Sequence, residues 1–325
     1  MSMAGHDLSL SIGENYLAFS RHAARGRSRA YEVLAAEVAT DPVVLGFLAS
    51  LPAAKRQPNL VFAAAWYLLG HPPDIGSLRA AVTGRGPELT AVIQARRTQT
   101  NEPARCACLL PALAQLPAPL ALLEVGASAG LTLLPDRYSY AYPGHPLIAG
   151  TDPRAPVLRC AARGPVPLPR HVPEVCWRAG LDLNPLDVAS DADMRWLECL
   201  LWPGETGRQR RLADAIAAAR RDPPPVHRGD LLTDLPALAR QAPPEATLVI
   251  YHSAVLGYLS EAGRHQFAAT AGGLAAVWLA NEPAATLDLA VTGSDAAFQL
   301  VRDGREVLAI TDPHGTWLRW LGGQA

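Results

Sequence analysis

The apolar positions in the first third of the chain follow the spacing of amphipathic helices. The stretch 31–38 places its apolar side chains on one helical face. Asp41 followed by Pro42 is a start signal for a helix over the apolar residues that come next. Asn59 is a candidate cap for a third helix, which would end at Gly70. Further helices are predicted near Ser77–Val82, Glu88–Arg97 and Pro103–Leu116, and no strand is predicted before Leu120.

From this point onward, short apolar runs alternate with helical stretches. Such alternation is typical of a parallel sheet covered by helices. The predicted strands are Leu120–Val125, Val175–Leu181, Val226–Gly229, Thr247–Tyr251 and Leu274–Leu279. Three further runs near the C-terminal end are separated by short turns, which favours antiparallel strands at the end of the sheet. These runs are Leu287–Thr292, Phe298–Arg302 and Glu306–Ile310.

These patterns divide the chain into two predicted parts. Residues 1–116 form a helical N-terminal region, and residues 117–325 form an α/β domain with a Rossmann-like, mostly parallel sheet. The segment Tyr138–Pro173 is rich in Pro and Gly and fits neither pattern, so it is predicted to be an insertion. The 325 residues and the 49% hydrophobic content are enough for a sizeable core.

The overall charge does not indicate a nucleic-acid partner. The formal net charge is −1, so the chain has no broad basic character. Arginines gather near residues 21–29 and 208–211, where we interpret them as solvated helix faces balanced by nearby acids. A small-molecule substrate is therefore expected, and the sequence makes no prediction about oligomeric state.

The five cysteines indicate reduced thiols in the cytoplasm. None forms a C-x-x-C pair and no His/Cys spacing suits zinc, so no metal site is predicted. The start of the chain lacks the basic region followed by an apolar one that a secretory signal needs. The longest apolar run, Leu60–Leu69, is shorter than the ~20 residues that span a bilayer. A cytoplasmic protein without a membrane partner is therefore expected.

The stretch 120–131, LALLEVGASAGL, carries the strongest candidate chemistry. An apolar strand ends in an acid, Glu124, and is followed by a turn of small residues over 126–130 and a stretch compatible with a helix. Glycines let the backbone approach a ligand closely, and a helix N-terminus offers free N–H groups. The sequence therefore predicts a cofactor cradle. The same letters also spell G-x-S-x-G, the nucleophile turn of a serine hydrolase.

Two acids further along the chain favour the cofactor cradle. Asp182, in the sequence GLDLNP, follows the second predicted strand, where a carboxylate can accept from both hydroxyls of a ribose. Asp230, after Gly229 in GDLLTDLP, follows the third predicted strand and can accept from an adenine amino group. Because the carboxyl ends of parallel strands meet at one edge of a sheet, Glu124, Asp182 and Asp230 are expected to surround one ligand.

The order of EVGASAG, GLDLNP and GDLLTDLP resembles that of class I S-adenosylmethionine-dependent methyltransferases. The resemblance implies that the turn lines the methionine portion of the cofactor and that Glu124 organises the turn and reaches the ligand amino group. It implies that Asp182 holds the ribose and that Asp230 meets the adenine edge. The terminal antiparallel strands also fit the sheet of that family. The implied cofactor residues are Glu124, Gly126, Ala127, Ser128, Gly130, Asp182, Gly229 and Asp230.

More narrowly, the chain resembles an uncharacterised bacterial family (DUF2332-like) whose members share the EVGASAGLxLLxDRY stretch. They also share Thr100–Glu102, Tyr251–Ser253 and His314–Trp317, so this likeness covers most of the chain. It implies no substrate, because the family has none assigned.

The spacing of the acids departs from the methyltransferase pattern. Asp182 follows Glu124 by 58 residues, where a simple βαβ unit has ~20. The insertion over Tyr138–Pro173 must absorb this difference. If Tyr138–Tyr142 were instead the second strand of the sheet, Asp182 would lose its predicted role.

Methyl transfer needs an acceptor held in line with the methyl group, and often a base. His252 begins the loop after the fourth predicted strand and is the candidate catalytic base. The alternative is a histidine that is hydrogen-bonded within the packing at the strand end. Tyr258 and Glu282 are weaker candidates, and His314 is at most part of the wall of an acceptor site.

A polar island over 99–105 precedes a predicted helix. Arg105 in this island can pair with the methionine carboxylate of the cofactor. The alternative for the island is helix capping by Thr100 or Asn101.

The sequence therefore predicts an S-adenosylmethionine-dependent methyltransferase that acts on a small-molecule acceptor. One alternative is an α/β-hydrolase-type serine hydrolase with Ser128 as nucleophile, His314 as base and Asp288 or Asp312 as the acid. The long helical region before the first strand and the acids in GLDLNP and GDLLTDLP have no explanation in such a hydrolase. A second alternative is a non-catalytic nucleotide-binding module, from which no sequence feature separates the enzyme.

Overall fold

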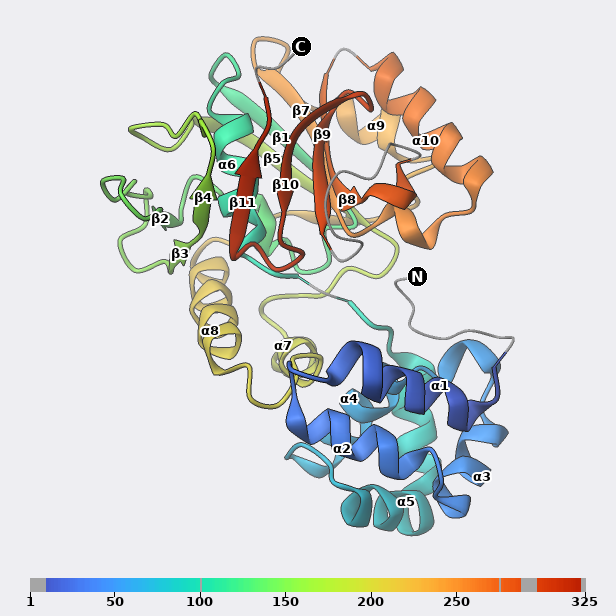
Figure 1. Cartoon of the computed structure of the whole chain (residues 1–325). Helices are drawn as coiled ribbons and strands as arrows, with labels where there is room; N and C mark the ends of the chain where they lie inside the picture. Colours follow the sequence, from blue (N-terminus) through green and yellow to red (C-terminus); the bar gives the residue numbers. More distant parts are fainter. Residues whose placement is uncertain (1–9, 100, 275, 288–296, 323–325) are drawn as a thin grey trace. The chain divides into compact units, whose positions relative to one another are not determined.

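The computed structural model describes residues 10–99, 101–274, 276–287 and 297–322 (Figure 1). By its internal contacts the chain divides into two compact units. One unit comprises Met1–Thr100 with Asp191–Arg210, and the other comprises Asn101–Ser190 with Arg211–Ala325. The first unit is helical and the second contains the sheet. The segment 101–116, which the sequence pattern assigns to the helical region, belongs to the sheet unit.

The helical unit is built around an aromatic core. Phe62 packs against the rings of Tyr16, Phe19 and Tyr31. The Tyr16 and Phe19 rings meet Phe62 edge to face and the Tyr31 ring is tilted against it, and such ring pairs add to the stabilisation that burial provides. The elements of the unit are α1 (Ile12–Ala18), the π-helical turn η1 (Phe19–Ala24), α2 (Arg29–Val38), α3 (Pro42–Ser50), the 3₁₀ turn η2 (Ala53–Lys55), α4 (Pro58–Leu69), α5 (Ile75–Ala95) and α7 (Asp191–Cys199). Helix α8 (Thr206–Arg221) then carries the chain into the sheet unit.

Several of the predicted helix signals are confirmed. Asp41 caps α3 by accepting from two backbone N–H groups at 2.9 Å each. Gly70 ends α4 in a left-handed conformation with a φ of +88°. Asn59 is not a cap, because α4 begins one residue before it. The two helices predicted between residues 77 and 97 are one element, α5, with a break in helical geometry at Arg85.

The described helices were also compared with the requirements of a membrane span. No single one of them is long and apolar enough to cross a bilayer, and α2 with α3 meets the requirement only as a pair bent by 84°. In the described part of the chain, no group of three His, Cys, Asp or Glu side chains is placed to hold a metal ion.

The sheet unit contains a nine-stranded mixed sheet with the order β4-β11-β10-β9-β8-β7-β1-β5-β6 (Figure 1). The five strands from β8 to β6 are parallel, whereas β9, β10 and β11 alternate in direction. This confirms the predicted α/β fold with antiparallel C-terminal strands, although 288–292 of one predicted strand lie outside the described residues. The strands are β1 (Leu120–Val125), β4 (Ala161–Arg163), β5 (Val175–Asp182), β6 (Val226–Arg228), β7 (Thr247–Ser253), β8 (Val277–Pro283), β9 (Phe298–Arg302), β10 (Glu306–Thr311) and β11 (Trp317–Trp320).

The order of the parallel strands determines where a ligand can bind. Along the chain these strands are β1, β5, β6, β7 and β8, so the first strand lies between the second and the fourth. This is the third-second-first-fourth-fifth order of nucleotide-binding sheets. The strand order reverses between β1 and β7, and open α/β sheets bind ligands at the carboxyl ends of the strands beside such a switch point.

The two faces of the sheet are covered by different helices (Figure 1). One face packs against α9 (Leu235–Ala239) and α10 (Glu261–Gly273) in a core that includes Leu123 and Ile250. Because side chains alternate along a strand, Glu124 and Tyr251 point to the opposite face. Helix α6 (Arg105–Leu113), every residue of which is buried, lies on that side. Glu124 therefore enters a well-covered interior.

The predicted insertion contains a small sheet of its own. Strand β2 (Ser139–Ala141) pairs in parallel with β3 (Val157–Arg159), and neither joins the nine-stranded sheet. The alternative in which Tyr138–Tyr142 is the second strand of the main sheet is therefore wrong. Strand β5 pairs with β1 instead, which brings Asp182 to the edge where the turn lies.

The helix predicted after the turn is absent, and the prediction is wrong for an identifiable reason. The turn leads only into a 3₁₀ turn, η3 (Leu131–Leu133). The carbonyls of η3 accept hydrogen bonds from the side chains of Tyr138 at 2.6 Å, Tyr251 at 2.9 Å and Arg178 at 2.6 Å. An α-helix would need these carbonyls for its own ladder, and Pro135 has no N–H to contribute to it. The turn therefore has no helix N-terminus to offer a ligand.

Candidate functional site

The site is built at the carboxyl end of β1, where the chain turns over residues 126–130. Gly126, Ser128 and Gly130 have φ angles of +70°, +54° and +72°. These left-handed residues curl the backbone tightly, and Ser128 is an uncommon non-glycine residue in that region. The carboxylate of Asp182 braces the turn, because its Oδ2 accepts from the N–H of Ser128 at 2.8 Å. Its Oδ1 accepts from the N–H of Asn184 at 2.7 Å. The structure thus brings the predicted turn and the predicted ribose acid together.

The glycines of the turn are also required by the packing of the chain itself. A Cβ atom at Gly126 would lie 2.3 Å from Cγ2 of Val255, and one at Gly130 would lie 2.7 Å from Cγ of Pro224. Ala127 is limited in the same way, because its Cβ lies where Gly180 has no side chain. The packing of the folded chain therefore also explains the small residues of the turn, which the sequence analysis attributed to a cofactor cradle.

Glu124 is the buried acid of the site, with 4% of its surface exposed. Its Oε1 accepts a hydrogen bond from the hydroxyl of Thr132, which itself accepts from the amide of Asn101 at 3.3 Å. Its Oε2 has no hydrogen-bond partner. Leaving a buried polar atom unpaired is costly, so such an atom in a native protein points to a water, a ligand or a functional role.

The environment of Glu124 favours its neutral form. Burial raises the pKa of the Glu124 carboxyl to about 8. The hydrogen bond from Thr132 and the positive charge of Arg105 lower this pKa, whereas the negative charge of Asp182 raises it further. A guanidinium and a second acid therefore lie within electrostatic reach of Glu124, and the carboxyl carries a proton at neutral pH.

Ser128 contributes a second buried oxygen without a partner. The residue is 2% exposed and its Oγ makes no hydrogen bond. It is therefore not bonded to His314, as the nucleophile of a hydrolase would be. Asp312 instead accepts from the N–H of His314 at 3.0 Å and from the hydroxyl of Thr316 at 2.9 Å. Asp288 lies outside the described residues, so no Ser-His-Asp triad is assembled in the part that the structure describes.

His252 lies in the core and is closed off from solvent. Strand β7 continues two residues beyond its predicted end, so His252 belongs to the strand and is 0% exposed. Its Nε2 accepts from the indole N–H of Trp278 at 2.9 Å, and its Nδ1 lies 2.7 Å from Oε1 of Glu282. An accepting Nε2 places the ring proton on Nδ1, which then donates to Glu282. The position supports the alternative of a histidine within the strand-end packing and not the predicted role as a base.

Glu282 fastens the loop after β7 to the end of β8. Besides His252, its Oε1 accepts from the N–H groups of Val255 at 2.7 Å and Leu256 at 3.2 Å. Val255 is the residue that packs against Gly126. The His252–Glu282 pair therefore holds this loop against the turn after β1.

Gly229 and Asp230 follow β6 at the same edge of the sheet. The N–H of Gly229 donates to the carbonyl of Asp182 at 3.0 Å, which ties the third strand end to the second. Oδ1 of Asp230 accepts from the N–H of Leu232 at 2.8 Å. Tyr258, at the end of the 3₁₀ turn η4 (Leu256–Tyr258), is 61% exposed. The structure thus places Asp230 beside Asp182, on the side away from β1.

Arg105 lies buried in the first turn of α6. Its Nε donates to the carbonyl of Pro313 at 2.9 Å and its Nη1 to the carbonyl of Ser253 at 3.0 Å. These bonds connect the loop after β10 to the end of β7. In this structure Arg105 therefore joins loops at the edge of the sheet, and its charge acts on Glu124 from that position.

Asn101 and Thr132 form a support for Glu124 that sequence reasoning missed. The N-cap of α6 makes no side-chain hydrogen bond, so Asn101 is not its cap. Its Oδ1 accepts from the N–H of Leu131 at 2.8 Å instead. Thr100, the other capping candidate, lies outside the described residues. The available signal for Thr132 was a single polar residue within an apolar run, which is weak on its own.

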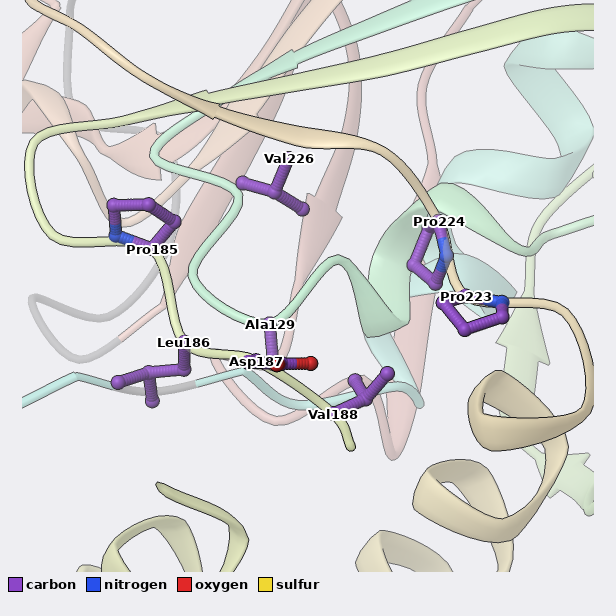
Figure 2. Close-up of a pocket in the computed structure, with 8 residues that line it drawn as sticks. All are labelled: Ala129, Pro185, Leu186, Asp187, Val188, Pro223, Pro224 and Val226. Carbon is purple, nitrogen blue, oxygen red and sulfur yellow. The ribbon is translucent and has the colours of Figure 1, made fainter. Parts of the chain in front are cut away.

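A pocket of about 210 Å³ opens beside the turn (Figure 2). Its wall combines Ala129 of the turn with the loop after β5 and the segment that leads into β6. The lining residues are Ala129, Pro185, Leu186, Asp187, Val188, Pro223, Pro224 and Val226. Ligand pockets commonly measure ~300–1,000 Å³, so this pocket alone could enclose only one part of a nucleotide-sized ligand.

The comparisons with known proteins identify the family. The model of the family described as an uncharacterised protein conserved in bacteria (DUF2332) matches residues 13–320, and the chain therefore belongs to that family. No curated protein and no solved structure matches the chain.

Proposed function

We propose that this protein binds S-adenosylmethionine at the turn after β1 and transfers its methyl group to a small-molecule acceptor. The observation that carries the proposal is the buried, unpartnered Oε2 of Glu124 at the switch point of the sheet. An ammonium group is a fitting partner for a buried carboxylate, because charge-assisted hydrogen bonds are the strong ones. The sheet order supports a nucleotide ligand at this edge.

The three acids around the turn can each hold a different part of this cofactor. Glu124 would hold the amino group, and Asp182 the ribose. Asp182 already accepts two backbone N–H groups, but a carboxylate has about four acceptor positions, so capacity remains for the ribose hydroxyls. Asp230 would meet the adenine edge. No helix dipole contributes, since only η3 follows the turn.

The chemistry assigns different tasks to the cofactor and to the chain. When bound, S-adenosylmethionine supplies an activated methyl group. Glu124 and Asp182 bind and orient it, while the loop that His252 and Glu282 anchor packs Val255 against the turn and excludes water there. His252 enters the proposal as a positioning residue, because both its ring nitrogens are engaged.

Isothermal titration calorimetry with a panel of ligands tests the proposal. S-adenosylmethionine and S-adenosylhomocysteine are expected to bind with micromolar dissociation constants, about −8 kcal/mol. NAD is expected not to bind, and p-nitrophenyl acetate is expected not to be hydrolysed. Absence of binding of both adenosyl ligands at millimolar concentration would overturn the proposal. An esterase activity that Ser128→Ala removes, with unchanged ligand affinity, would favour the hydrolase.

A matched pair of variants links the binding to the site. Glu124→Gln is expected to weaken S-adenosylhomocysteine but not 5′-methylthioadenosine, which lacks the amino-acid end. Glu245→Gln removes an exposed acid and is expected to leave both affinities unchanged. If Glu124→Gln weakened both ligands equally, the assignment of Glu124 to the amino group would be wrong.

A further inference from the structure

The hydrogen bonds around Glu124 determine which of its oxygens carries the proton. The hydroxyl of Thr132 accepts from the amide of Asn101 and donates its own hydrogen to Oε1 of Glu124. Oε1 is thus an acceptor, and in the neutral carboxyl the proton sits on Oε2. That is also the oxygen without a partner.

The charged and titratable groups around Glu124 come from each element that packs near it. Arg105 and Cys106 belong to α6, and Asp182 belongs to β5. Tyr251 of β7 and Tyr138, which precedes β2, also interact electrostatically with the carboxyl. Burial raises the pKa values of the Cys106 thiol and both tyrosines well above their usual range, so these three groups are neutral.

The remaining charges are those of Arg105 and Asp182, which act on Glu124 in opposite directions. Burial has the largest effect on the Glu124 pKa and decides the state of the carboxyl. The neutral form of Glu124 is therefore the stable one in the absence of a ligand at neutral pH.

We infer that this site exchanges a proton for an ammonium group: a ligand with a primary ammonium binds only as Glu124 releases the proton from Oε2. The inference rests on the proposed function, because it takes the amino end of S-adenosylmethionine as that group. A cation beside a neutral buried carboxyl would be an unpaired buried charge, which costs several kcal/mol. Ligand and proton therefore compete for the same oxygen.

The competition sets the pH dependence of binding. Below the Glu124 pKa of about 8, the carboxyl must lose its proton before the ammonium can bind. Affinity should therefore rise by about tenfold for each pH unit in this range. Above that pKa it should level off, provided that the ligand amine remains protonated.

Calorimetry in two buffers measures the proton directly. S-adenosylhomocysteine is titrated at pH 7 in phosphate and in Tris, whose ionisation enthalpies differ widely. The two apparent enthalpies are expected to differ by the amount that corresponds to release of about one proton per ligand. 5′-Methylthioadenosine, which has no ammonium group, should release none.

Three variants separate the inference from its alternatives. Glu124→Gln should abolish proton release, and Glu245→Gln should leave it unchanged. Thr132→Val removes the hydrogen bond that lowers the Glu124 pKa, so its affinity profile should shift to higher pH. The Thr132→Val variant keeps the test valid if Glu124→Gln does not fold.

The outcomes distinguish the inference from the proposed function. Binding of S-adenosylhomocysteine without proton release, and with constant affinity between pH 6 and pH 8, would overturn the inference and leave the proposed function standing. Absence of binding at every pH would overturn both. Proton release that persists in Glu124→Gln would place the titrating group elsewhere and also contradict the inference.

Discussion

Two buried glutamates, one near the end of β1 and one near the end of β8, show how differently one residue type is used in this protein. Oε1 of Glu282 accepts from a histidine ring and two backbone N–H groups, all between 2.7 and 3.2 Å. Oε1 of Glu124 accepts from one hydroxyl. Each acid leaves Oε2 unpartnered. Glu282 is therefore part of the framework of a loop, whereas Glu124 is held by a single hydrogen-bond donor.

The same substitution is expected to have very different effects at the two acids. Glu282→Leu leaves the His252 ring and two buried N–H groups without their acceptor, and we expect it to lower the free energy of unfolding by about 4 kcal/mol. Glu124→Leu leaves only one hydroxyl unpaired and should cost about 1 kcal/mol or less. Urea denaturation of the two variants at pH 7 measures the difference. Equal losses would show that both acids belong to the framework.

A pair of glycines tests whether the loop held by Glu282 is pressed against the turn. Gly126→Ala brings a Cβ within 2.3 Å of Val255, whereas Gly144→Ala meets nothing within 4 Å, and the φ angles are +70° and +80°. The backbone strain is therefore similar and the steric clash differs. We expect Gly126→Ala to lose about 2 kcal/mol more in the free energy of unfolding. Similar thermal shifts for both variants would mean that Val255 moves aside freely.

The sequence predicted the positions of these acids better than their roles. Strand β1 has its predicted limits. Asp182 lies beside the turn despite its unusual spacing, because β2 and β3 of the insertion pair with each other and β5 pairs with β1. Strand-end polarity alone does not distinguish a ligand contact from a structural bond. His252 illustrates this: two further residues in β7 place it in the core, and its partners Trp278 and Glu282 come from another strand.

The missing helix after the turn has a similar cause. Local spacing in 131–138 is compatible with a helix, but the carbonyls of η3 bind Tyr138, Arg178 and Tyr251. Two of these three residues lie on other strands. The sequence around the turn therefore does not indicate that distant side chains compete with a helix for these carbonyls. The network of Asn101, Thr132 and Glu124 was missed for the same reason.

The buried carboxyl of Glu124 should also make the stability of the protein depend on pH. Folding raises the Glu124 pKa from its usual 4.5 to about 8, so the native state binds this proton more tightly than the unfolded chain. The contribution to stability is greatest below pH 4.5 and is lost as the pH rises through 8. Wild-type protein should therefore lose about 2 kcal/mol more than Glu124→Gln between pH 6 and pH 8. Urea midpoints across this range measure the difference, with Glu245→Gln as the matched control. Parallel curves for the two variants would contradict a neutral Glu124.

The smallest effect is expected at Thr132, where one hydroxyl orients the acid. Thr132→Val keeps the shape of the side chain but removes the donor to Oε1 of Glu124 and the acceptor for the amide of Asn101. The loss of stability should be about 1 kcal/mol at pH 5, where the carboxyl is neutral in the native state. Because that hydrogen bond lowers the Glu124 pKa, the variant should keep its neutral carboxyl to a higher pH than the wild type. Carbon-13 NMR of labelled glutamate carboxyls can follow this titration. An unchanged Glu124 titration would mean that the Thr132 hydroxyl does not influence the pKa of this carboxyl. The hydrogen-bond donor on Glu124 would then matter less than its burial.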